Sequence, residues 1–129
     1  VGFCMGGNIA LALACSGDYA AAGVNYGDLD EDRYAELAEA CPVVASYGGR
    51  DRSLRETPVR LARALAEHGV DHDVEVYPSA GHGFLNDHRG ETPLWALVAG
   101  WYAHTGYDEA AATAARARII AFFEVHLAA

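Results

Sequence analysis

The most informative residue of this chain is Cys4, because its surroundings are typical of a nucleophile. It lies in the run GFCMGG at residues 2–7, directly before an apolar helical stretch. The pattern G-x-C-x-G-G is that of a nucleophile elbow with cysteine in place of serine, a sharp strand-to-helix turn that projects the side chain clear of a sheet. We expect the flanking glycines where strand and helix pass too close for side chains. The positive end of the helix dipole favours a thiolate at Cys4.

Two further glycine-rich turns carry the partners that such a nucleophile needs. Asp51 ends the run GGRD and His82 is the centre of AGHGF, so the order along the chain is nucleophile, acid, histidine. A histidine takes the thiol proton and later protonates a leaving group or activates water. The aspartate holds the imidazole tautomer and stabilises the imidazolium. The backbone N–H of Met5, next to the nucleophile, is predicted to supply half of an oxyanion hole.

Each of these residues also has a simpler interpretation. A cysteine at a strand end is usually a small buried hydrophobe, Asp51 alone could cap a turn, and His82 alone could be a surface histidine. The glycine flanks and the order of the three residues favour the catalytic interpretation. The other two cysteines, Cys15 and Cys41, have no such surroundings and are predicted to be core thiols.

The elements that must position these residues alternate along the chain. Short apolar runs, each too short for a helix, predict buried strands at Ala20–Val24, Val43–Tyr47 and Val74–Tyr77. Helical patterns separate and follow them, at Gly6–Cys15, Asp32–Ala40, Thr57–His68 and Asp108–Leu127. This alternation predicts an α/β fold, with a mostly parallel sheet flanked by helices. Ligands bind at the carboxyl ends of such strands, where all three candidate residues fall.

Details of three segments can be predicted from residue type. Thr57 is expected to be an N-cap with Pro58 in the first turn, and Gly69 is expected to stop that helix. In the last helix, Ile119, Ile120, Phe122, Phe123 and Leu127 are expected to face a core. The segment Gly90–Gly106 has apolar residues at helical spacing, which indicates either a helix packed on the body or a lid over an active site.

Composition excludes several classes of function. The 129 residues carry a net charge of −9, with nine arginines and no lysine, which argues against a nucleic-acid partner. No uninterrupted apolar stretch reaches the roughly 18 residues of a membrane span. The sequence contains no HExxH, CxxC or P-loop pattern, so we expect no metal or cofactor. Three cysteines, an odd number, fit a reducing cytoplasm better than a disulfide framework.

The motifs together resemble the dienelactone hydrolase family of α/β-hydrolases, on the stretches GFCMGG, YGGRD and AGHGF. The resemblance covers nearly the whole chain and implies the C-terminal part of a single α/β-hydrolase domain, residues 1–129. Since the elbow stands at the first residues, we expect the N-terminal part of that domain to be missing. The resemblance assigns the nucleophile to Cys4, the acid to Asp51 and the base to His82. It implies hydrolysis of an enol-lactone or a related small ester through an acyl-thioester, without a cofactor.

The resemblance also suggests where substrate contacts lie. Characterised family members have an arginine four residues after the histidine that helps to bind the substrate carboxylate, and this chain has Asn86 there. Arg89 lies three residues further on, and Phe84 belongs to the AGHGF motif, so all three are candidate substrate-binding residues. Two alternatives stay open: a promiscuous esterase or short-peptide hydrolase of the same fold, and a non-catalytic member of the family.

Overall fold

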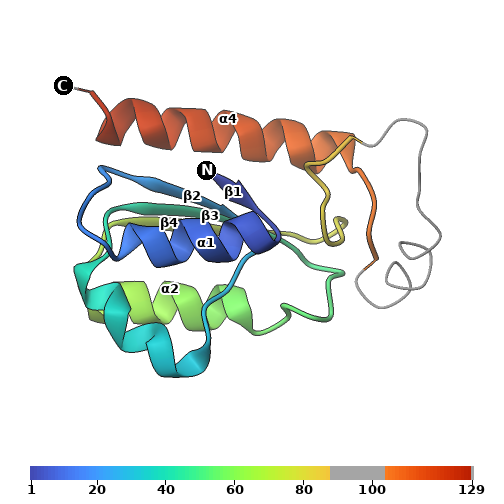
Figure 1. Ribbon diagram of the computed structural model, residues 1–129. Helices are drawn as coiled ribbons and strands as arrows, with labels where there is room; N and C mark the ends of the chain where they lie inside the picture. The colour runs from blue at the N-terminus through green and yellow to red at the C-terminus, as the bar shows by residue number, and fades with distance from the viewer. Residues whose placement is uncertain (88–103, 129) are drawn as a thin grey trace.

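The computed structural model describes residues 1–87 and 104–128, which form a parallel sheet with helices on both faces (Figure 1). Within these residues the sheet contains β1 (Gly2–Phe3), β2 (Ala22–Asn25), β3 (Val43–Gly48) and β4 (His72–Tyr77). The strands lie in the order β1-β2-β3-β4 and every neighbouring pair is parallel. The predicted α/β architecture is therefore confirmed.

The strand order explains which face each helix covers. The helical elements are α1 (Met5–Ala14), the 3₁₀ helix η1 (Glu31–Glu39), α2 (Thr57–Glu67) and α4 (Glu109–His126). Each crossover moves one strand further in the same direction, and crossovers between parallel strands are right-handed, so α1, η1 and α2 fall on one face. The chain leaves β4 without a further crossover among the described residues, and α4 lies along the other face (Figure 1).

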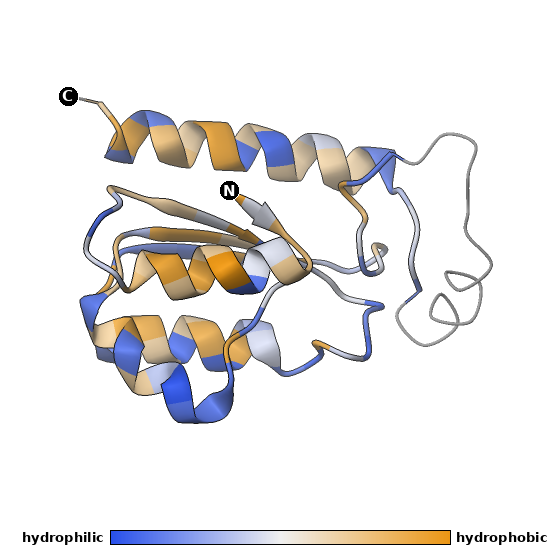
Figure 2. Ribbon diagram, in the orientation of Figure 1, coloured by the Kyte–Doolittle hydropathy of each residue, from blue (hydrophilic) through white to orange (hydrophobic). Residues whose placement is uncertain are grey.

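The face under α1 and α2 holds the larger apolar cluster of the described residues. Alternate residues of the strands meet one stripe of each helix there. Figure 2 shows the hydrophobic colour on the strands and on α1 and α2. The fully enclosed members of this cluster are Leu11, Val24, Leu37, Val43, Ala45, Leu61 and Leu65. Leu61 and Leu65 are one helical turn apart, which is the spacing that buries one face of an amphipathic helix.

The opposite face is built differently, and it corrects one prediction. The buried residues of α4 are Ala111, Ala112, Ala115 and Ile119. Ile120 is 58% exposed and Leu127 is 54% exposed, so the expectation that they face a core is wrong. For the other three residues the expectation holds at Ile119, which is buried, and in part at Phe122 and Phe123, which are partly buried. The alanines let the helix approach the sheet closely, and Ile120 and Leu127 lie on its exposed side.

A guanidinium group attaches α4 to the middle of the sheet. Arg118 donates hydrogen bonds to the carbonyl oxygens of Ala45 and Asp73 and to the Ser46 hydroxyl. It also forms an ion pair of 2.7 Å with the Asp73 carboxylate. Because Arg118 reaches both β3 and β4, it fixes the position of the helix across two strands.

Two predicted helix features differ from the structure. The segment around residues 32–40 is a 3₁₀ helix, Glu31–Glu39, rather than an α-helix. Thr57 is the first residue of α2 instead of its N-cap, and Glu56 at the cap position makes no capping hydrogen bond. The Thr57 hydroxyl donates instead to Asp28, at 2.7 Å, because a tertiary partner is available. Gly69 follows α2 with φ 69°, so its predicted role as the helix stop is confirmed.

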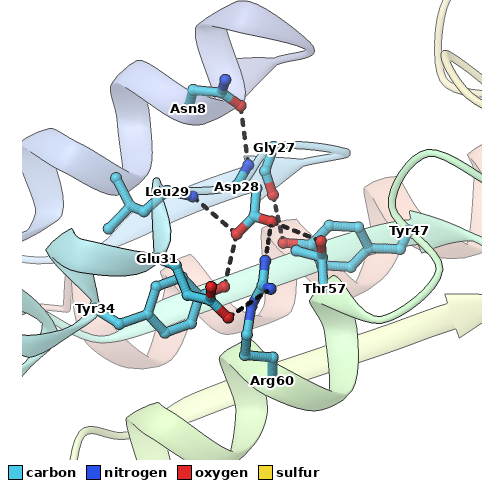
Figure 3. Close-up of polar contacts among 9 residues, drawn as sticks. All are labelled: Asn8, Gly27, Asp28, Leu29, Glu31, Tyr34, Tyr47, Thr57 and Arg60. Carbon is cyan, nitrogen blue, oxygen red and sulfur yellow. Dashed lines mark hydrogen bonds and ion pairs between the residues drawn. The ribbon is translucent and has the colours of Figure 1, made fainter.

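The carboxylate of Asp28, just beyond β2, joins the elements on the first face (Figure 3). One oxygen accepts from the Tyr34 hydroxyl of η1 at 2.6 Å, and the other accepts from Thr57 and from Arg60 of α2. The backbone N–H of Asp28 donates to the Asn8 side chain of α1 at 2.9 Å. This network fixes the loop that follows β2 against three helical elements.

Close backbone contacts at the elbow require two of its three glycines. A Cβ on Gly2 would lie 1.8 Å from the carbonyl oxygen of Gly6, and a Cβ on Gly7 would lie 2.7 Å from that of Asn25. A Cβ on Gly6 would meet nothing within 4 Å. The expectation that strand and helix pass too close for side chains therefore holds at Gly2 and Gly7 but not at Gly6.

This difference gives a matched pair of substitutions in α1. Gly7→Ala forces a Cβ against backbone atoms that cannot move independently, so we expect it to lower the free energy of unfolding by about 1–3 kcal/mol. Gly6→Ala has room and gains helix propensity, so we expect a rise of up to about 1 kcal/mol. Urea unfolding of the two variants beside the parent measures both changes. Equal stabilities for Gly6→Ala and Gly7→Ala would contradict the close contact at Gly7.

Candidate active site

Cys4 is held in an unusual backbone conformation at the tip of the elbow. It is the N-cap of α1 with φ 54° and ψ −120°, a region that costs a residue with a side chain about 1–3 kcal/mol. Its N–H donates to the carbonyl of Asn25 at 3.0 Å, and its own carbonyl accepts from Gly7 at 2.8 Å. The thiol is consequently exposed at the carboxyl end of β1 and directly before a helix N-terminus.

The structure brings the three predicted side chains together. His82 Nδ1 lies 2.7 Å from Asp51 Oδ2, and His82 Nε2 lies 3.2 Å from Cys4 Sγ. An ionised carboxylate only accepts, so Nδ1 carries the proton of this bond and Nε2 faces the sulfur. The order thiol, imidazole, carboxylate allows a proton to move from sulfur to nitrogen while the carboxylate stabilises the resulting charge.

Asp51 is almost completely buried, and its carboxylate is held by a second residue. Its side chain is only 1% exposed. Oδ1 accepts from the backbone N–H of Ser53 at 2.9 Å and also from the Ser53 hydroxyl, which leaves Oδ2 for His82. Sequence reasoning missed Ser53, although a serine two residues after an aspartate is a typical turn signal that could have indicated it.

Tyr26 supports the histidine ring from the other side, and sequence reasoning also missed it. Its ring centroid lies 5.0 Å from that of His82, and its hydroxyl donates to Asn86 Oδ1 at 3.2 Å. Tyr26 has φ 42°, which a residue with a side chain seldom adopts. It directly follows β2 and precedes Gly27, so the strained turn directs its ring under His82.

These contacts change the acidity of the site in a consistent direction. The hydrogen bond that His82 donates to Asp51 raises the pKa of His82 above its ordinary value, although burial opposes this. Burial alone would raise the pKa of the Asp51 carboxyl, but the hydrogen bonds from His82 and Ser53 outweigh it and lower that pKa. Burial also raises the pKa of Tyr26 well above that of an ordinary tyrosine. Relative to the isolated groups, both shifts of the pair favour the charged form, an imidazolium on His82 and a carboxylate on Asp51.

The remaining predicted residues have different positions. Met5 is the first residue of α1, where a backbone N–H has no acceptor within the helix. Asn86 lies beside the site through its bond with Tyr26. Phe84 is fully buried against the rings of Tyr26 and Tyr77, so it belongs to the core and does not line a surface that a substrate reaches. Arg89 lies outside the described residues.

Several other expectations concern residues around the site. Cys15 and Cys41 are free, half-buried thiols whose pKa is raised by burial. Most of the segment 90–106, the predicted helix or lid, lies outside the described residues, which resume at His104.

Residues 1–87 and 104–128 contain no cluster of three side chains that could hold a metal ion. No helix in these two ranges is both long enough and apolar enough to cross a membrane.

Known proteins with the same pattern were found by sequence and by structure. A Yersinia pestis protein named "Putative carboxymethylenebutenolidase" is 32% identical over 111 residues, covering 78% of this chain and 42% of its own length. A Saccharolobus solfataricus protein of the same name is 32% identical over 92 residues, covering 71% of this chain and 35% of its own. The chain thus spans less than half the length of these relatives.

A solved structure shows the same arrangement of elements. The "Putative Dienelactone Hydrolase" of Klebsiella pneumoniae superposes with a TM-score of 0.73 at 26% identity, over 95% of this chain and 49% of its own. The family model described as dienelactone hydrolase family matches residues 1–127, which include Cys4, Asp51 and His82. This protein therefore belongs to the dienelactone hydrolase family of α/β-hydrolases.

Proposed function

We propose that this protein hydrolyses small carboxylic esters or lactones through an acyl-thioester on Cys4. The observation that carries the proposal is the continuous line of contacts Cys4–His82–Asp51, with the sulfur exposed at a helix N-terminus. The names of its relatives point to the same class of reaction. The free thiols fit a reducing compartment, and we infer a cytoplasmic enzyme acting on a small molecule.

In the first half of the proposed reaction, His82 Nε2 takes the proton from Cys4 as the sulfur attacks the carbonyl carbon. The carbonyl oxygen becomes an oxyanion, which the N–H of Met5 stabilises. The intermediate then expels the alcohol oxygen, which takes the proton from His82, and an acyl-thioester remains on Cys4. Asp51 holds the Nδ1 proton throughout and stabilises the imidazolium.

In the second half, water replaces the alcohol. His82 takes a proton from the water as its oxygen attacks the thioester carbon, and the sulfur leaves and recovers that proton. The product is a carboxylic acid and the Cys4 thiol is restored. We propose that Asn86 contributes to substrate binding, together with Arg89, which lies three residues later in the sequence. The hydrogen bond from Tyr26 to Asn86 Oδ1 directs the amide group of Asn86.

Removal of the nucleophile tests this mechanism directly. In the intact protein, Cys4→Ala should abolish hydrolysis of an activated ester such as p-nitrophenyl acetate, a loss of about 10³-fold or more. Cys4→Ser should retain little activity, because serine is a weaker nucleophile in a site built for a thiolate. Mass spectrometry after brief mixing should find the acetyl group on Cys4.

Cys15→Ala and Cys41→Ala are the matched controls, because each removes a half-buried thiol outside the site. We expect both to keep the parent's rate to within about threefold, in line with the modest effect of a substitution that touches no catalytic group. Full activity in Cys4→Ala, or an acetyl group on another residue, would rule out the covalent mechanism.

The proposed role of Asp51 predicts a change in the titration of His82. Asp51→Asn removes the carboxylate that raises the pKa of His82, so the midpoint of the His82 ring signals should move to lower pH in an NMR titration. Because folding raises the pKa of His82, the protonated ring stabilises the folded state at pH values below the ordinary pKa of histidine. This contribution is lost as the pH rises through the raised pKa. The lowered pKa of Asp51 has the opposite effect, and its contribution is lost as the pH falls through that value. Asp51→Asn should therefore be most destabilising between the ordinary pKa values of aspartate and histidine.

Asp71→Asn serves as the control, because Asp71 faces another histidine, His126, at 3.4 Å outside the site. It should leave the His82 titration unchanged. If the midpoint of His82 were the same in Asp51→Asn as in the parent, Asp51 would have no electrostatic role.

A further inference from the structure

A cleft of about 290 Å³ lies against the loop that carries Asp51. Its lining consists of Gly49, Arg50, Asp51, Arg52, Arg55 and His104. Three of these six residues are arginines, and all three have exposed side chains. The single acid of the lining, Asp51, already bonds His82 and Ser53 through its two oxygens. The cleft therefore carries a local excess of positive charge.

This excess is unusual for the chain as a whole. Acidic residues outnumber basic ones by 18 to 9. Four of the other five described arginines pair with a carboxylate, namely Arg33, Arg60, Arg63 and Arg118. The fifth, Arg116, donates a hydrogen bond to the carbonyl oxygen of Leu85. Arg50, Arg52 and Arg55 form no such ion pair or side-chain hydrogen bond with any described residue. A group of guanidiniums without carboxylate partners, in a chain rich in carboxylates, is typical of a site for an anionic ligand.

His104 gives a second, independent indication of a ligand. Its Nδ1 is buried and has no hydrogen-bond partner among the described residues, and the residue is part of the cleft lining. A buried nitrogen without a partner costs free energy unless a ligand or water bonds it. The backbone of His104 packs so closely on Gly81 that a Cβ there would lie 1.6 Å from the His104 carbonyl oxygen. This contact places the cleft wall directly beside the turn that holds His82.

We propose that this cleft binds a phosphate group. A phosphate carries about −1.5 to −2 charges at neutral pH and three strong acceptor oxygens, which suits several guanidinium groups and an imidazole N–H at once. A carboxylate carries one charge, and its two oxygens match the paired N–H donors of one guanidinium. It would therefore leave other donors of this lining without an acceptor. The cleft borders the loop that carries Asp51. Phosphate binding there does not depend on the proposed function.

The test measures binding without turnover, in the Cys4→Ala background of the intact protein. Isothermal titration with inorganic phosphate should show saturable binding. The double variant Arg52→Gln/Arg55→Gln should weaken it by about tenfold or more, the loss expected for two charge-assisted contacts. The double variant Arg33→Gln/Arg63→Gln removes the same charge from two exposed arginines that pair with neighbouring glutamates, and it should keep the parent's affinity to within about twofold.

His104→Ala is a second variant that leaves all the arginines in place, and it should also weaken phosphate binding. Circular dichroism of each variant checks that it is folded. Absence of saturable binding, an equal loss in both double variants, or acetate binding as tightly as phosphate would each overturn the proposal. Failure of Cys4 acetylation with phosphate binding intact would contradict the hydrolase mechanism instead, so the two failures can be told apart.

Discussion

The close contact between the elbow and the end of β2 is the constraint on which the rest of the site depends. Gly7 and Gly27 meet backbone to backbone, and a Cβ on Gly27 would lie 2.4 Å from the carbonyl carbon of Gly7. This approach allows Cys4 to bond Asn25 while its thiol points outward. It also makes the chain turn sharply after β2, which places Tyr26 under His82. The nucleophile and the support of its base are thus set by one contact between the first turn of α1 and the turn after β2.

The second requirement of the site is that the Asp51 carboxylate remains ionised although its side chain is almost completely buried. Asp51 achieves this because every strong acceptor position of its side chain faces a donor, from Ser53 on one oxygen and His82 on the other. A buried charge without such partners would cost several kcal/mol, or the group would be neutral. The loop after β3 therefore does more than supply an acid, because its turn encloses the carboxylate that the histidine needs.

The sequence was sufficient to predict the fold class and the convergence of Cys4, Asp51 and His82, because strand ends in a parallel sheet meet at one edge and glycine motifs mark the turns. It was not sufficient for contacts made between distant elements. The local sequence predicts that the Thr57 hydroxyl caps α2, but this hydroxyl donates a hydrogen bond to Asp28, which lies 29 residues earlier. Helical spacing alone likewise could not show that Ile120 and Leu127 of α4 are exposed, since this depends on how the helix is rotated against the sheet.

The attachment of α4 by Arg118 gives the two faces of the sheet different responses to the solvent. The face under α1 and α2 is held by aliphatic side chains, and excluded salts such as sulfate strengthen that kind of burial. Helix α4 itself buries mainly alanines, and it is also held by a guanidinium that is partly accessible, with 17% of its side chain exposed. The ion pair of this guanidinium weakens as ionic strength rises. A salt such as sulfate therefore strengthens the apolar burial in the fold and weakens the charge interaction that helps to hold α4.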